Sequence, residues 1–173
     1  NFIDCTAGQG GHTFAMLERS GPKGKVLAIE WDSQALEALY EEARKRQYQN
    51  RIIGECENFA HLQEIVKRQK FQPVHGILFD LGLSSDQLEH SGRGFSFQKD
   101  EPLDMRYNTA TQLNAEKIVN YWNRKDLERI LKEYGEERFA KEIAEEIVSA
   151  RAQKPIRKTF QLVELIYKAT PKS

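Results

Sequence analysis

The chain has 173 residues, of which 39% are hydrophobic, and its 26 basic and 26 acidic side chains give a net charge of zero. A chain of this length supports one sizeable core, with an appended subdomain at most. Zero net charge excludes a global positive field, so RNA binding would need a local patch. With two cysteines, no C-x-x-C pair and four histidines, we expect a reduced, cytoplasmic protein without a metal site. No run of about 18 apolar residues is present, so we expect no membrane partner.

Short apolar runs and amphipathic stretches alternate over the first part of the chain. The apolar runs predict buried strands at 2–4, 25–30, 51–54 and 74–80. The stretches between them predict helices at 12–20, 33–47 and 61–69, the second with Ser33 as its N-cap. Strand and helix in alternation predict an α/β fold, with a parallel sheet covered by helices on both faces. Because the chain already begins in a strand-like run, we expect further chain before it, and a targeting segment there stays open.

The pattern changes after Asp80. Residues 81–112 are rich in Gly, Ser and Asp without sustained periodicity, which predicts a long functional loop. The remainder predicts helices only, at 115–122, 124–135, 136–153 and 159–169, with an interruption at Pro155.

The first predicted strand is followed by a glycine-rich turn with Gly8, Gly10 and Gly11. Such a turn lets backbone approach a ligand at the carboxyl end of the strand. A dinucleotide pattern starting at Gly8 would need Gly or Ala where Thr13 stands, which weakens a pyrophosphate interpretation. Glu30 ends the second predicted strand, where an acidic side chain accepts hydrogen bonds from ribose hydroxyls. These features favour S-adenosylmethionine over a nicotinamide cofactor, while a purely structural turn stays open.

His12 and Asp80 are candidate site residues at the same edge of the predicted sheet. His12 begins the first predicted helix, where it either has a structural role, capping that helix or satisfying a local hydrogen bond, or borders the methionine end of the cofactor. Asp80 ends the fourth predicted strand and points toward the same crevice as the glycine turn. A carboxylate there can accept hydrogen bonds from a substrate amine and orient it for methyl transfer. The alternative is a plain turn or helix-cap role for Asp80.

Basic and aromatic side chains are interleaved within the predicted loop, at Arg93, Phe95, Phe97, Lys99, Arg106 and Tyr107. This combination suits stacking on unpaired bases and contacts to phosphate. We therefore take Arg93, Phe95, Phe97 and Arg106 as candidate RNA-binding residues. The alternative is that the two phenylalanines pin the loop to the core.

Five motifs occur in order along nearly the whole chain: D-x-T-x-G-x-G-G-H at 4–12, D-L-G-x-S-S-x-Q-L at 80–88, R-G-F-S-F at 93–97, P-L-D-M-R at 102–106 and Y-G-E-E-R-F-A at 134–140. With these motifs the chain resembles the MraW-type ribosomal RNA methyltransferases. Those enzymes use S-adenosylmethionine to methylate N4 of a cytosine in the decoding region of small-subunit ribosomal RNA. The resemblance implies the same activity here, with small-subunit ribosomal RNA or the assembled subunit as partner and a homodimer as a possible assembly.

The resemblance also implies a fold and a set of site residues. The fold is a Rossmann-like methyltransferase core over residues 1–108, with a helical inserted subdomain for substrate recognition over residues 109–173. The implied cofactor contacts are Gly10, Gly11, His12, Glu30, Phe59, Asp80 and Gln87, and Asp80 is also the implied catalytic residue. Two positions depart from the family pattern: Glu30 stands for a usual Asp, and Cys5 for a usual Gly. The second departure predicts that the backbone at Cys5 does not need positive φ.

The family pattern continues beyond this sequence, with the last strands of the sheet and an S-F-H-S-L-E-D-R segment. The chain therefore resembles a fragment with an incomplete sheet, and we expect further chain or a partner to cover its exposed apolar surface. Two rival hypotheses remain: a methylase of another amine in DNA or protein, and an inactive RNA-binding assembly factor. A nicotinamide dehydrogenase is a distant third, because no hydride-transfer residue is evident.

Overall fold

The computed structural model describes residues 1–171. The chain divides into two compact units, Asn1–Gly82 and the chain from Leu83 onward. We call them the sheet unit and the helical unit, and each is described by itself. The functional division at residue 108 stays a prediction.

The sheet unit is a parallel four-stranded sheet with the order β3-β2-β1-β4. Its strands are β1 (Phe2–Asp4), β2 (Val26–Glu30), β3 (Ile52–Cys56) and β4 (Gly76–Leu78). Its helices are α1 (Gly11–Arg19), α2 (Ser33–Lys45), the short 3-10 helix η1 (Phe59–His61) and α3 (Leu62–Gln69). This alternation confirms the predicted α/β class, with an incomplete Rossmann-like parallel sheet.

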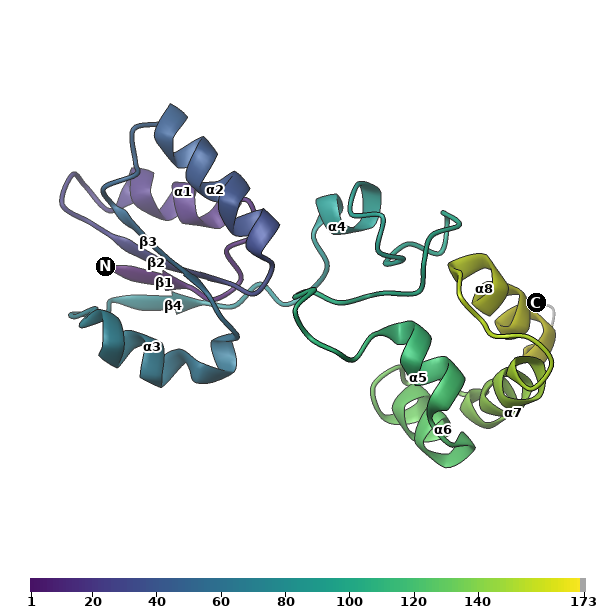
Figure 1. Cartoon of the computed structure of the whole chain (residues 1–173). Helices are drawn as coiled ribbons and strands as arrows, with labels where there is room; N and C mark the ends of the chain where they lie inside the picture. The colour runs from purple at the N-terminus through teal and green to yellow at the C-terminus, as the bar shows by residue number, and fades with distance from the viewer. Residues whose placement is uncertain (172–173) are drawn as a thin grey trace. The chain divides into compact units, whose positions relative to one another are not determined.

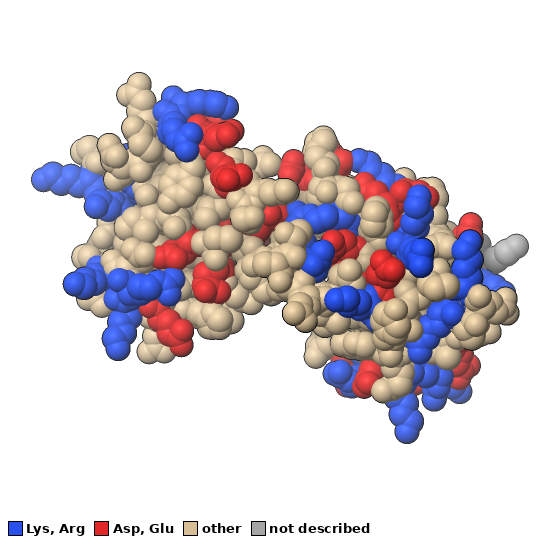
Figure 2. Space-filling model, in the orientation of Figure 1, with Lys and Arg blue, Asp and Glu red and all other residues tan. Residues whose placement is uncertain are grey.

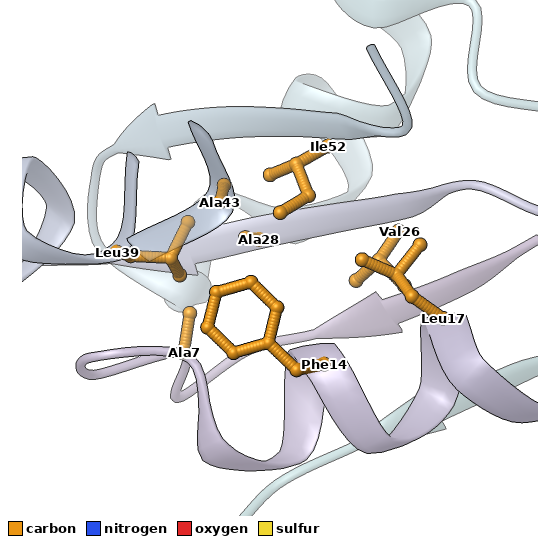
Figure 3. Close-up of a cluster of buried hydrophobic side chains, with 8 residues drawn as sticks. All are labelled: Ala7, Phe14, Leu17, Val26, Ala28, Leu39, Ala43 and Ile52. Atoms are coloured by element: carbon orange, nitrogen blue, oxygen red, sulfur yellow. The ribbon is translucent and has the colours of Figure 1, made fainter. Parts of the chain in front are cut away.

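The central strand β2 separates two layers of core. Alternate residues of a strand point to opposite faces, so Val26 and Ala28 pack with Leu17 of α1 and other residues from α1 and α2 (Figure 3). Leu27 and Ile29 pack in a second cluster on the other face, together with side chains from α3. Figure 1 shows α1 and α2 over one face of the sheet and α3 over the other. Burial on both faces explains why β2 reads as a continuous apolar run.

The edge strand β4 keeps apolar side chains in solvent. It pairs with β1, and Ile77 is 50% exposed. Phe79, which follows β4, is 47% exposed. Exposed apolar surface was expected of an incomplete sheet, and it lies at this edge.

The start of α2 corrects one prediction. The N-cap is Asp32, whose carboxylate accepts the backbone N–H of Gln34 at 3.1 Å, and Ser33 is the first helical residue. Aspartate and serine are comparable caps, so local preference alone did not separate two adjacent candidates. At Cys5 the prediction holds, because Cys5 is not among the residues with positive φ.

The helical unit contains α4 (Ser85–Glu89), α5 (Ala115–Tyr121), α6 (Arg124–Glu133), α7 (Ala140–Arg151) and α8 (Thr159–Ala169). Side chains from α5, α6 and α7 meet in one apolar cluster, made of Leu103, Val119, Leu127, Ile143, Ala144, Ile147 and Ile156. On the visible face of this unit, acidic and basic side chains are intermixed (Figure 2). Mixed charges on a helix surface are typical of a solvated face rather than of a site.

The helical unit differs from the prediction most at α4 and at the start of α7. The helix α4 lies inside the predicted loop, closed by a capping box in which Ser84 and Gln87 exchange side-chain and backbone hydrogen bonds. The helix α7 begins at Ala140 and not at residue 136, because Glu136 has a positive φ (50°) that a right-handed helix does not accommodate. Within residues 1–171, no helix has the length and apolar character needed to cross a membrane.

Candidate functional site

The turn between β1 and α1 places two glycines in different environments. Gly10, at the N-cap of α1, has φ of 99°, and a Cβ there would lie 2.4 Å from Cε2 of Phe14. Gly10 is therefore required by the turn and by close packing of the Phe14 ring. A Cβ on Gly11 would meet nothing within 4 Å. Fold packing does not demand glycine at position 11, which leaves room for a ligand to approach the backbone.

Glu30 ties the end of β2 to this turn. Its Oε2 accepts the backbone N–H of Gly8 at 2.8 Å, and its Oε1 accepts the N–H of Asp32 at 2.8 Å. Each carboxylate oxygen has more than one acceptor direction. Glu30 is therefore held in place by the backbone and can still accept hydrogen bonds from ribose hydroxyls.

The buried carboxylate of Asp4 supports the glycine turn and the strand ends beside it, which together we call the corner. Asp4 is fully buried, and it accepts the Thr13 hydroxyl at 2.7 Å and the Thr6 backbone N–H at 3.2 Å. Burial raises the pKa of Asp4 above its ordinary value of 3.8, and these two hydrogen bonds oppose the rise. Thr13, which weakened the pyrophosphate interpretation, thus has a structural role: it joins the start of α1 to the end of β1.

At this corner His12, in the first turn of α1, contacts Asp80, which follows β4. Nε2 of His12 lies 3.0 Å from Oδ2 of Asp80, and the side chains are 57% and 68% exposed. The backbone N–H of Asp80 donates to Oγ1 of Thr6 at 2.8 Å. Neither residue caps a helix, since α1 has no side-chain cap and α4 is capped by Ser84. The cap alternatives for His12 and Asp80 are therefore wrong.

Phe59 begins η1 and contacts a second aromatic ring. Phe59 and Phe79 pack edge to face with ring centroids 5.6 Å apart, and they are 39% and 47% exposed. Such pairs favour a fixed relative orientation. The pair gives the carboxyl ends of β3 and β4 an exposed aromatic surface on which a purine could stack.

Gln87 lies in the helical unit and is 8% exposed. Its Oε1 accepts the backbone N–H of Ser84 at 3.0 Å, and its own N–H donates to the Ser84 hydroxyl at 3.1 Å. These bonds give Gln87 a structural role at the start of α4. Its predicted cofactor contact stays a prediction.

Arg93 and Arg106 are held by their own segment. Arg93 Nη1 donates to the carbonyls of Arg106 and Tyr107 at 2.9 and 3.0 Å. The Arg106 guanidinium makes two hydrogen bonds to the Asp104 carboxylate, at 2.5 and 2.7 Å, and also donates to the carbonyls of Thr109 and Thr111. The Arg106 backbone N–H donates to the same carboxylate at 3.2 Å. The hydrogen bonds from Arg106 hold the pKa of Asp104 below its ordinary value of 3.8. Both guanidinium groups therefore shape this segment, and their predicted RNA contacts stay untested.

The two phenylalanines of this segment differ. Phe95 is 8% exposed and packs edge to face on Tyr107 with centroids 5.6 Å apart. Phe97 is 70% exposed. Phe95 therefore pins the segment, as the alternative expects, while Phe97 is exposed; the predicted RNA contacts of both rings stay a prediction.

The structure brings together the glycine turn, His12, Glu30 and Asp80 in the sheet unit. Sequence reasoning missed the supporting residues Thr6 and Phe79. The D-x-T pattern at the end of β1 carried a signal for Thr6, since an aspartate side chain often accepts the backbone N–H of the residue two positions on. No local pattern could show that the Thr6 hydroxyl accepts a bond from a residue 74 positions away.

The cysteines are both free thiols, Cys5 buried and Cys56 exposed. Burial, with a smaller effect of Asp4, raises the pKa of Cys5 to about 11. Cys5 thus stays a neutral thiol at physiological pH, and it fits a structural role beneath the site.

Comparison with known proteins places the chain. A family model described as the MraW methylase family matches residues 1–173. The ribosomal RNA small subunit methyltransferase H of Coxiella burnetii (strain CbuG_Q212) is 45% identical over 175 residues, covering 98% of this chain and 55% of that protein. The protein of the same name from Clostridium botulinum (strain Kyoto / Type A2) is 43% identical over 170 residues, covering 98% and 54%. That from Symbiobacterium thermophilum is 41% identical over 172 residues, covering 99% and 54%. The chain spans about half the length of these relatives.

Proposed function

Since the chain belongs to the MraW methylase family, we propose that it contributes to methyl transfer from S-adenosylmethionine to N4 of a cytosine in the decoding region of small-subunit ribosomal RNA. The partner is that RNA or the assembled small subunit, in the cytoplasm. The relatives named above support an RNA of the small ribosomal subunit as substrate. The observation that carries the proposal is that the carboxyl ends of β1, β2 and β4 meet in the sheet unit. We call this place the junction; its contacts are Glu30 with Gly8 and His12 with Asp80.

That junction fits the cofactor. Gly11 leaves its backbone open, Glu30 offers a fixed carboxylate, and Phe59 offers an exposed ring. In this assignment Gly10 shapes the turn, Glu30 accepts from the ribose and Phe59 stacks on the adenine. Gln87, in the helical unit, stays a predicted cofactor contact that the resemblance implies. S-adenosylmethionine, when bound, supplies a methyl group on a positively charged sulfur.

Asp80 is the proposed catalytic residue. Its carboxylate is 68% exposed, and Oδ1 has no hydrogen-bond partner among residues 1–171. An exocyclic amine conjugated with a pyrimidine ring is a weak nucleophile, so its orientation matters. By accepting an N–H from N4, Asp80 would align the amine for attack, and positioning of this kind supplies much of the barrier reduction. The target base must leave its stack to reach the site.

RNA recognition is proposed for the segment from Arg93 to Arg106. Phe97 is the accessible ring on which an unpaired base would stack. Arg93, Phe95 and Arg106 hold the segment in shape, and Arg93 and Arg106 add positive charge that attracts phosphate.

The central test is an Asp80→Ala variant of the complete protein, assayed on small subunits for N4-methylcytosine. We expect loss of methyl transfer with an unchanged melting temperature, because the side chain is exposed. Glu64→Ala, an exposed carboxylate on α3, is the matched control and should behave as wild type. Full activity of Asp80→Ala would contradict the mechanism.

A second test separates the enzyme from an inactive assembly factor. Calorimetry with S-adenosylmethionine should give binding to the wild type, weakened about tenfold or more in Glu30→Gln, since hydrogen bonds to charged groups contribute roughly 1.5–3 kcal/mol. Glutamine keeps an oxygen for only one of the two backbone N–H groups, those of Gly8 and Asp32, so a thermal melt of the variant is the control that shows whether the turn persists. Ribosomal RNA binding without cofactor affinity would favour the assembly factor. Methylation of DNA or protein amines instead of cytosine would favour the other rival.

A further inference from the structure

The pair formed by His12 and Asp80 has no evident role in stability. Both side chains are more than half exposed, at 57% and 68%. Ion pairs at such exposure contribute little to folding, typically 0–1 kcal/mol. The two residues lie 68 positions apart and come from different elements, so a local helix interaction does not explain their contact.

Asp80 is held from two sides. Its backbone N–H donates to Thr6 Oγ1 at 2.8 Å, and its Oδ2 lies 3.0 Å from His12 Nε2. Oδ2 is therefore occupied, while Oδ1 has no partner among residues 1–171. Fixing the backbone and one oxygen of a carboxylate fixes the direction in which its other oxygen accepts.

Thr6 and His12, the two residues that contact Asp80, are both linked to the buried Asp4. The Thr6 N–H donates to Asp4 Oδ1 at 3.2 Å. The hydroxyl of Thr13, the residue after His12, donates to Asp4 Oδ2 at 2.7 Å. Hydrogen bonds and short chain links thus form a closed ring through the ends of β1 and β4 and the start of α1. A ring of this kind keeps its members aligned when one of them fluctuates.

We propose that His12 is a positioning residue: its Nε2–H holds Oδ2 of Asp80, so that Oδ1 faces the substrate amine. An ionised carboxylate only accepts hydrogen bonds, so Nε2 carries the proton in this contact. Neutral imidazole and imidazolium both meet this requirement. The buried Asp4 is an acidic group that interacts electrostatically with both His12 and Asp80. The inference rests on the proposed function, and it assigns His12 a role through Asp80 in place of the cofactor contact that the resemblance implies; the Kd for S-adenosylmethionine distinguishes the two roles.

Kinetics of the complete protein test the role. His12→Ala should lower kcat roughly 10- to 100-fold, the scale of small misplacements in an active site. The Kd values for S-adenosylmethionine and for RNA should stay within about twofold of wild type. His12→Gln, whose amide nitrogen can replace Nε2–H as donor, should restore much of the lost turnover relative to His12→Ala.

A double-mutant cycle sharpens the assignment. In an Asp80→Asn background, His12→Ala should cause no further loss, because the group that His12 positions is already gone. Additive losses would overturn the inference. So would weakened cofactor binding by His12→Ala with unchanged turnover at saturation, since His12 would then act on the cofactor.

A measurement without substrate separates this inference from the proposed function. Two-bond proton–nitrogen correlation spectra, with the His12 signal assigned by its absence in His12→Gln, report which ring nitrogen is protonated. We expect the Nε2–H form in wild type and a changed tautomer balance in Asp80→Asn. An unchanged spectrum would overturn the pairing even if ribosomal RNA is methylated. A changed spectrum with no methylation would leave the pairing intact and contradict the proposed function.

Discussion

Two aspartates, one in each unit, organise a turn by opposite means. Asp4 in the sheet unit is fully buried and accepts bonds from a hydroxyl and a backbone N–H. Asp104 in the helical unit is partly exposed and accepts two bonds from the guanidinium of Arg106. Burial raises the pKa of Asp4, whereas Arg106 lowers that of Asp104.

The difference follows from what each place requires. Beneath the glycine turn there is room for short neutral donors, which hold Asp4 without a buried cation. In residues 93–107, which we call the charged segment, the guanidinium of Arg106 binds the Asp104 carboxylate and two carbonyls together. Asp4 is thus held by neutral donors, whereas Asp104 is held by a charged one.

The largest effect tests whether the two units are stabilised separately. Leu27 and Leu127 are matched leucines, 0% and 1% exposed, in the cores of the sheet unit and the helical unit. Replacing either by Ala should cost about 2–5 kcal/mol. Hydrogen exchange should show faster opening in the unit that carries the change. Equal loss of protection in both units from either variant would break the comparison.

A pair of adjacent glycines tests the packing of the corner. Gly10→Ala would force a positive-φ residue against the Phe14 ring and should cost about 2–3 kcal/mol or more. Gly11→Ala meets no protein atom within 4 Å, so its stability should match wild type. Thermal melts and calorimetry check both. Weaker binding of S-adenosylmethionine by a fully stable Gly11→Ala would mark position 11 as ligand contact; unchanged binding would remove it from the proposed site.

These local features show what sequence could predict. The sheet was predictable because buried parallel strands are short apolar runs, and β2 is buried on both faces. Its helices followed from apolar periodicity, but the N-cap of α2 did not, since Asp32 and Ser33 are both good caps. The helix α4 was missed, although Ser84 and Gln87 carry the spacing of a capping box.

The site was predictable only as a list of strand-end residues. Parallel strands bring their carboxyl ends to one edge, which placed Glu30 and Asp80 near the glycine turn. The contacts that orient them were not predictable: Glu30 binds Gly8 across 22 positions, and Asp80 binds His12 across 68. Such distant bonds leave no periodic signal in the sequence.

Acid conditions test the charged segment. The folded-state pKa of Asp104 lies below 3.8. The stability that this carboxylate contributes is therefore present above pH 3.8, and it is lost as pH falls through the folded-state pKa. Asp104→Asn should cost roughly 1 kcal/mol at pH 7, because the pair is partly exposed. It should also remove part of the acid-induced loss of stability below pH 4. Urea unfolding at several pH values checks both, and an unaltered acid limb would contradict the role of Arg106.

The stability contributed by the buried carboxyl group of Asp4 should depend on pH in the opposite direction. The folded-state pKa of Asp4 lies above 3.8, so its contribution is fully present below that value and is lost as pH rises through the folded pKa. Asp4→Asn keeps the shape and removes this loss. The variant should therefore gain stability relative to wild type as pH rises above about 4, with a difference within about 1 kcal/mol at pH 7. A gain as pH falls instead would show that Asp4 is stabilised in its ionised form.

The smallest effect on stability concerns the accessible ring of the charged segment. Phe97 is 70% exposed, so Phe97→Ala should change the free energy of unfolding by no more than about 0.5 kcal/mol. Tyr121, 81% exposed on α5, is a matched aromatic control in the same unit. Stacking on a base contributes roughly 1–3 kcal/mol, so Phe97→Ala should weaken binding of single-stranded ribosomal RNA about fivefold or more, and Tyr121→Ala should not. Equal RNA affinities for the two variants would mean that the charged segment shapes the protein without reading the RNA through Phe97.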